Sequence, residues 1–103
     1  WQRFNRSMAK KPLEWTRRAQ SDRQRIAEFY AEEASPLIAV EALAAIRSAA
    51  DRGRKSPLAY RTGKRAGTRE LVMRRFPYVL IYRIQPNSIV ILRVLHQSMR
   101  YFN

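Results

Sequence analysis

The chain of 103 residues contains no cysteine and a single histidine. A disulfide framework and a thiolate metal site are therefore excluded, and one histidine is too few for the common zinc sites. We expect neither a metal nor a cofactor. Long apolar runs are also missing, because Glu41 interrupts the best candidate before it reaches the roughly 18 residues that a membrane span needs. No segment has the order of a secretory signal, so the cytoplasm is the expected compartment.

Acidic residues are scarce as well. Eight Asp and Glu face 21 Lys and Arg, which gives a net charge of +13. A small soluble domain is well served by a charge of about 2–8 in magnitude. The excess therefore predicts attraction to nucleic acid, an acidic protein or an anionic surface, and says little about the fold.

The 46% apolar fraction is typical of a folded chain, and the length suits one modest core. We predict a single domain over residues 9–103. Residues 1–8 follow no periodic pattern, and we assign them as an extension or a cloning-derived segment without a function.

The first half of the domain reads as a short strand and two helices. Residues 13–15 alternate like an edge strand, and residues 17–33 have helical spacing behind a capping Thr16. A second start signal follows at Ser35-Pro36, a capping hydroxyl and then a proline at the first helical position. Because the link is short, we expect an antiparallel helical hairpin.

The second half reads as a basic loop and three strands. Periodicity vanishes over residues 51–66, which are rich in turn formers and cations. Strands then follow with breaks at residues 74–77 and 85–88, so an antiparallel meander is the natural pairing. The predicted fold is α+β, in the order β-α-α-β-β-β, with the hairpin packed on one face of a small, mainly antiparallel sheet.

Alternation in the strands predicts which face each side chain occupies. Val90, Leu92 and Val94 should meet the helices. The opposite face carries Arg83 and Arg93 among apolar residues, and these guanidinium groups must reach water or a partner.

Three segments of the chain resemble the RelE/ParE superfamily of bacterial toxins: Gly67-Thr68-Arg69-Glu70-Leu71, Tyr78-Val79-Leu80-Ile81-Tyr82-Arg83 and Arg93-Val94-Leu95-His96. The resemblance extends from about residue 13 to residue 101. It implies a toxin of a type II toxin–antitoxin pair, neutralised by an acidic antitoxin whose flexible segment folds on binding, with a toxin–antitoxin heterotetramer as one expected assembly. The chain departs from the pattern at Arg23, where an apolar residue is usual, and at Ala66, where proline is common.

Two activities occur in this superfamily. RelE-like members cleave messenger RNA on the ribosome, whereas ParE-like members poison DNA gyrase and are not nucleases. The segment from Arg93 to Met99 is more similar to the ParE branch, so growth arrest through gyrase is favoured and messenger RNA cleavage is the alternative.

The resemblance and the chemistry together nominate residues. For RNA cleavage the candidate catalytic residues are His96, Arg61, Lys64 and Arg69, with Glu70, Arg83 and Tyr101 as further members. For antitoxin or target binding they are Arg83, Arg93, Arg65, Tyr78 and Tyr82. Each has a structural alternative: the histidine as a strand-end hydrogen-bonding group, the glutamate as the partner of a nearby cation, and the two strand tyrosines as core aromatics.

Outside the superfamily, the basic charge also fits a small nucleic-acid-binding module or a structural ribosome-associated protein. A neighbouring gene for a small acidic protein would favour the toxin.

Overall fold

The computed structural model describes residues 11–102, with the side chains of residues 11–99. The predicted extension, residues 1–8, lies outside this range. The elements are β1 (Leu13–Trp15), α2 (Arg17–Glu33), α3 (Pro36–Lys55), the 3-10 turn η1 (Pro57–Ala59), β2 (Arg61–Thr62), β3 (Thr68–Val72), β4 (Tyr78–Ile84), β5 (Ile89–His96) and the 3-10 helix η2 (Gln97–Phe102).

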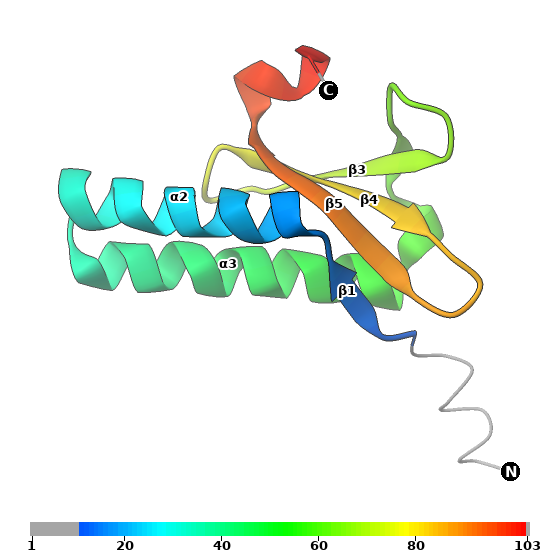
Figure 1. Cartoon of the computed structure of the whole chain (residues 1–103), viewed down its shortest axis with the longest axis horizontal. Helices are drawn as coiled ribbons and strands as arrows, with labels where there is room; N and C mark the ends of the chain where they lie inside the picture. The colour runs from blue at the N-terminus through cyan, green and yellow to red at the C-terminus, as the bar shows by residue number, and fades with distance from the viewer. Residues whose placement is uncertain (1–10, 103) are drawn as a thin grey trace, which may run out of the picture.

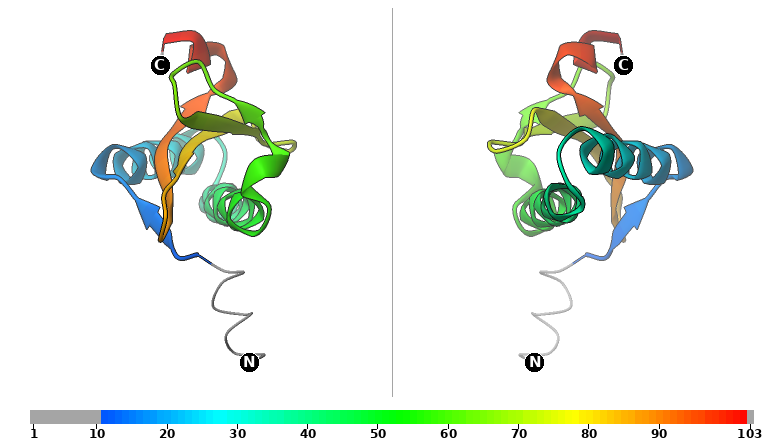
Figure 2. Two further views of the ribbon diagram at one scale, coloured as in Figure 1. Left: turned by 90° about the vertical axis from the view of Figure 1, so that its right-hand side faces the viewer. Right: turned by 90° about the vertical axis from the view of Figure 1, so that its left-hand side faces the viewer.

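The sheet has the strand order β1-β5-β4-β3-β2. Strand β1 pairs with β5 in parallel, and the other neighbours are antiparallel. The helices α2 and α3 form an antiparallel pair against one face of the sheet, while η2 and the β2–β3 loop project away from them (Figures 1 and 2). The predicted α+β fold is confirmed. Within residues 11–102, no helix is long and apolar enough to cross a membrane.

Both predicted helix starts are present. The Thr16 hydroxyl oxygen accepts from the backbone N–H of Ala19 at 3.0 Å, and the Ser35 hydroxyl oxygen accepts from Ile38 N–H at 3.2 Å. Two boundaries differ from the prediction. Helix α3 continues to Lys55, because Ala49, Ala50 and Gly53 stay buried against the sheet. The segment predicted as loop also contains the two-residue strand β2.

The predicted facing of β5 is partly wrong, because the strand carries a bulge. Ile81 opposes Arg93 while the next residue, Tyr82, opposes Ile91, so Leu92 is the extra residue. A bulge reverses the alternation on either side of it. Ile89, Ile91 and Val94 therefore lie in the core beneath the helices, and Leu92 packs on the other face.

That other face, turned away from α2 and α3, is called the open face here. It holds a small apolar cluster of Val79, Ile81 and Leu95, with Arg83 farther along β4 by alternation. The main core lies between the sheet and the helices, and its largest fully buried side chain is Tyr82.

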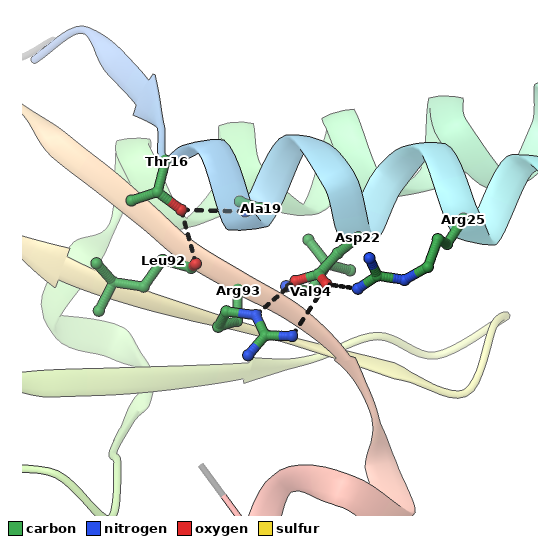
Figure 3. Close-up of polar contacts among 7 residues, drawn as sticks. All are labelled: Thr16, Ala19, Asp22, Arg25, Leu92, Arg93 and Val94. Carbon is green, nitrogen blue, oxygen red and sulfur yellow. Dashed lines mark hydrogen bonds and ion pairs between the residues drawn. The ribbon is translucent and has the colours of Figure 1, made fainter.

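Asp22 on α2 joins the helical layer to the last strand. Its side chain is 2% exposed, and its carboxylate accepts from Val94 N–H at 2.9 Å. Arg93 donates from Nε at 2.8 Å and from Nη2 at 3.0 Å, and Arg25 donates at 2.6 Å (Figure 3). Directly after β1, the Thr16 hydroxyl donates to the carbonyl of Leu92 at 2.8 Å. Thr16 and Asp22 thus provide hydrogen-bond partners for backbone groups of β5 that extend beyond its pairing with β1.

Replacing Asp22 with Asn should lower the free energy of unfolding by about 3 kcal/mol, because Arg93 is left as an uncompensated, mostly buried charge. Urea denaturation measures the loss. The matched variant Asp51→Asn removes the same charge from a more exposed pair with Arg54 and Lys55. Its midpoint should hardly move, and equal losses in both variants would contradict a special role for Asp22.

Candidate functional site

The residues nominated for RNA cleavage are distributed over both faces of the sheet. Arg61 and Glu70 oppose each other in β2 and β3, and Glu70 opposes Ile81, which places the pair on the open face. Arg61 Nε lies 3.0 Å from Glu70 Oε1, and Glu70 is buried. The structural alternative for Glu70, as the partner of a nearby cation, is confirmed.

Arg69 points to the opposite side of β3, opposite the core residue Tyr82. Its Nη1 donates to the carbonyl of Tyr60 at 2.6 Å and lies 3.5 Å from that of Leu58. Arg69 therefore connects residues 58–60, which follow α3, to strand β3 of the sheet. Lys64 is exposed in the loop between β2 and β3.

His96 ends β5 on the helix-facing side, where its ring and that of Tyr78 form a T-shaped pair with a centroid distance of 5.7 Å. Its Nδ1 accepts from the backbone N–H of Ser98 at 3.2 Å and lies 2.9 Å from the Ser98 hydroxyl. The predicted hydrogen bonding at the strand end is confirmed. The backbone of Tyr101 belongs to η2, but its side chain lies outside the described side chains.

His96 is far from the arginines nominated with it. His96 on β5 opposes Tyr78 of β4, and Arg69 on β3 opposes Tyr82 of β4. The two residues are therefore four positions apart along β4, and they belong to the strands on its two opposite edges. Strand geometry makes this about 13 Å along β4 and about 10 Å across it. Arg61 is one strand farther away and on the other face. The structure does not bring the four candidate catalytic residues together.

The two tyrosines nominated for binding lie in the core, 7% exposed at Tyr78 and 1% at Tyr82. The Tyr82 hydroxyl donates to the carbonyl of Pro57. Burial raises the pKa of Tyr82 to about 12. The pKa of Tyr78 also lies well above its usual value, first through burial and then through the neighbouring Tyr30 hydroxyl. Neither ring face is available for stacking on a base.

The three nominated arginines differ in their surroundings. Arg93 is bound to Asp22, which raises the pKa of the guanidinium despite the opposing effect of burial. Arg83 is half-buried on the open face, opposite Thr68, and its Nε is buried without a hydrogen-bond partner. Arg65 is exposed in the β2–β3 loop. Of the three nominated arginines, Arg83 and Arg65 remain as candidates for a contact with the antitoxin or the target.

A groove of about 620 Å³ lies between α3 and the end of β3 beyond its pairing with β2, and the sequence did not point to it. Its wall is apolar, with Ala45, Leu71 and Met73, and its rim carries Arg52, Arg74 and Arg75. Arg75 is bound to Glu41. The sequence signal for this groove is the pair Arg74-Arg75 directly after a strand, whereas the sequence pattern there predicts only part of a turn.

A second groove of about 240 Å³ separates α2 from β5 and η2. Two exposed apolar side chains lie in its lining, Phe29 at 52% and Met99 at 54% exposure, beside the charged Asp22, Arg25 and Arg93. His96 lines it together with Tyr78 and Leu95. Among residues 11–102, no group of three or more acidic or histidine side chains could hold a metal ion.

The fold is shared with two solved toxin–antitoxin structures. A chain from "Chromosomal ParDE TA system from P. aeruginosa" superposes with a TM-score of 0.77 at 24% identity, covering 85% of this chain and 97% of that one. A chain of the toxin–antitoxin complex RelBE2 from Mycobacterium tuberculosis gives a TM-score of 0.62 at 28% identity, covering 86% of this chain and 93% of that one. The architecture is therefore that of the RelE/ParE toxins.

Sequence comparison identifies the family within this superfamily. Residues 13–101 match the family described as the ParE toxin of the type II toxin–antitoxin system, parDE. "Putative toxin Y4kP" of Sinorhizobium fredii (strain NBRC 101917 / NGR234) is 34% identical over 94 residues, which are 91% of this chain and 96% of that protein. The chain belongs to the ParE toxin family and is a type II toxin of the RelE/ParE superfamily.

The buried hydroxyl of Tyr82 gives a testable pH dependence. Because its pKa is raised to about 12 by folding, the stability that it contributes is complete below its unfolded pKa of about 10 and is lost as the pH rises toward 12. Replacing Tyr82 with Phe should lower the free energy of unfolding near neutral pH, and the difference from the parent protein should shrink above pH 10. A difference that stays constant to pH 12 would contradict the buried hydroxyl.

Proposed function

We propose that this toxin arrests growth by a ParE-like action on DNA gyrase, and that it works as a binding protein without cleaving RNA. One observation carries the proposal: the candidate groups for RNA cleavage are split between the two faces of the sheet. Arg61 lies on the open face in an ion pair with buried Glu70, and His96 lies on the helix side at the far end of β4.

Cleavage of RNA through its 2′-hydroxyl needs a base, an acid and a cation at one phosphate group. A catalytic side chain must reach its proton at about 2.6–3.2 Å. Separations of about 13 Å along one strand do not meet this requirement. Arg69, moreover, uses its guanidinium on backbone carbonyls.

A RelE-like messenger RNA endoribonuclease is the alternative. It is favoured by the exposed ring of His96, whose second nitrogen could act as a base in the groove between α2 and β5. In that case the phosphate would have to be held by groups on this groove, such as Arg25, in place of the arginines nominated from the sequence.

We also propose neutralisation by an acidic antitoxin bound in the groove between α3 and β3. The apolar wall and the cationic rim suit an amphipathic acidic segment that folds on binding. The two structural neighbours belong to a ParDE system and to the toxin–antitoxin complex RelBE2, which supports a partner of this kind.

Target choice is tested by inducing the toxin without an antitoxin and examining plasmid topology and transcripts in the arrested cells. We expect protein-linked DNA breaks with intact transcripts. The variant His96→Ala should still arrest growth, because His96 has no catalytic task in this proposal. Cut transcripts, together with loss of arrest in a folded His96→Ala protein, would establish the endoribonuclease instead.

The antitoxin groove is tested with the cognate antitoxin, which we expect to be an acidic protein encoded beside the toxin gene. Reversing two rim charges, Arg52→Glu with Arg74→Glu, should weaken binding about tenfold or more, because like charges then face each other across the interface. The matched double reversal Arg17→Glu with Arg18→Glu changes the net charge equally at the start of α2. Calorimetric titration that finds equal losses in the two would indicate diffuse attraction and contradict the groove.

A further inference from the structure

The closed end of the helical hairpin, where α2 turns into α3, exposes apolar side chains. Leu37 and Val40, both near the start of α3, are 65% and 63% exposed. They are three residues apart and therefore neighbours on the helix surface, and the exposed Ala44 continues that side one turn farther along. The hairpin extends beyond the sheet at this end, so the sheet does not cover these side chains (Figure 1). Exposed apolar side chains that gather in one patch mark contacts with another protein.

The charge of the hairpin is divided into three blocks. Residues 26–46 contain four glutamates and no lysine or arginine, which gives −4. Residues 17–25 and residues 47–55 each contain four basic residues and one aspartate, which gives +3 per block. Because α2 and α3 run antiparallel, the two basic blocks lie side by side at the end next to β1, and the acidic block forms the closed end (Figure 1). The hairpin is therefore electrically polar along its length.

The glutamates of the closed end are available to a partner. Glu28, Glu32 and Glu33 are exposed, and no ion pair within residues 11–99 involves them. The fourth, Glu41, is paired with Arg75. A nucleic acid or an acidic antitoxin suits the net charge of +13 but is repelled by this end of the molecule. The exposed apolar patch therefore fits a partner with a cationic surface.

The other half of α3 offers such a surface. Arg47 lies seven residues after Val40, and Lys55 lies eighteen residues after Leu37, so both cations follow the outward side of the helix and both are exposed. Two copies packed with their α3 helices antiparallel bring the apolar and acidic closed end of each against the cationic half of the other. The contact forms twice, because a two-fold dimer uses the same surface on both subunits. A parallel arrangement would oppose like charges.

We propose that the outward side of α3 is a self-association surface, on which a second copy of this chain binds antiparallel through Leu37, Val40 and the glutamates of the closed end. One pair of helices about 30 Å long forms a small interface, and interfaces below about 1,200 Å² belong to the weak, transient class. The dimer therefore forms at high protein concentration. Neither the action on gyrase nor the antitoxin groove involves Leu37 or Val40, so this surface goes beyond the proposed function.

Sedimentation equilibrium of the full chain without antitoxin, from about 10 μM to about 1 mM, measures the self-association. Glu28→Lys with Glu32→Lys reverses the closed end, and Arg47→Glu with Lys55→Glu reverses the cationic half. Each double variant should weaken the dimer about tenfold or more, because like charges then face each other. When the two variants are mixed in equal amounts, they should associate with each other about as tightly as the parent protein, because their reversed ends are complementary again.

The second variant separates a local contact from the effect of overall charge. Arg47→Glu with Lys55→Glu lowers the net charge from +13 to +9, so diffuse repulsion between copies alone would make this variant associate more tightly than the parent. That result would overturn the proposal. So would a failure of the mixed variants to associate, since the reversed charges would then not meet.

A parent protein that stays monomeric at about 1 mM would also overturn the second copy as the occupant. Binding of a polylysine peptide by this monomer, lost in Glu28→Lys with Glu32→Lys, would assign the surface to a different cationic partner. Circular dichroism checks the fold of each protein. Should a charge variant fail to fold, Leu37→Gln with Val40→Gln decides the question, because both side chains are exposed and their loss should remove the dimer without unfolding the chain. An unchanged dimer in that variant contradicts the proposal.

Discussion

The carboxylate of Asp22 is the contact on which the arrangement of helices and sheet depends. It is almost fully buried, and it binds a backbone N–H of β5 and the guanidinium fork of Arg93 together. A buried charge is tolerated only when such partners are complete. Strand β1 ends after three residues, so the edge of β5 beyond it would otherwise lack partners for its backbone. Asp22 and Thr16 supply them, and in doing so they fix the position of α2 along the strand.

This use of charge explains how a protein with a net charge of +13 keeps few cations free on its sheet. Arg93 is bound to Asp22, Arg61 to Glu70, and Arg69 to backbone carbonyls. Other arginines line the groove between α3 and β3. On the sheet itself, Arg83 remains as a candidate for a contact, with its Nε buried and without a hydrogen-bond partner.

The element order and both helix caps could be predicted because they rest on local signals, a periodicity of apolar residues and the pairs Thr16 and Ser35-Pro36. The extension of α3 to Lys55 could not, since burial of Gly53 against Leu71 overrides a polar, glycine-containing sequence. The bulge at Leu92 was likewise hidden, because it depends on the register with β4. Once that register shifts, the predicted facing of Val90 and Leu92 fails. For the site, the sequence indicated the residue types, but the partners that decide their role are distant in the chain: Asp22, which binds Arg93, lies 71 positions away from it.

We propose that this toxin acts by binding gyrase and does not cleave RNA. The most direct measurement combines the purified toxin with purified gyrase and plasmid DNA, and in parallel with ribosomes translating a messenger RNA. The account predicts loss of supercoiling activity and protein-linked DNA breaks in the first reaction, with intact messenger RNA in the second. Cleaved messenger RNA with gyrase unaffected would contradict it.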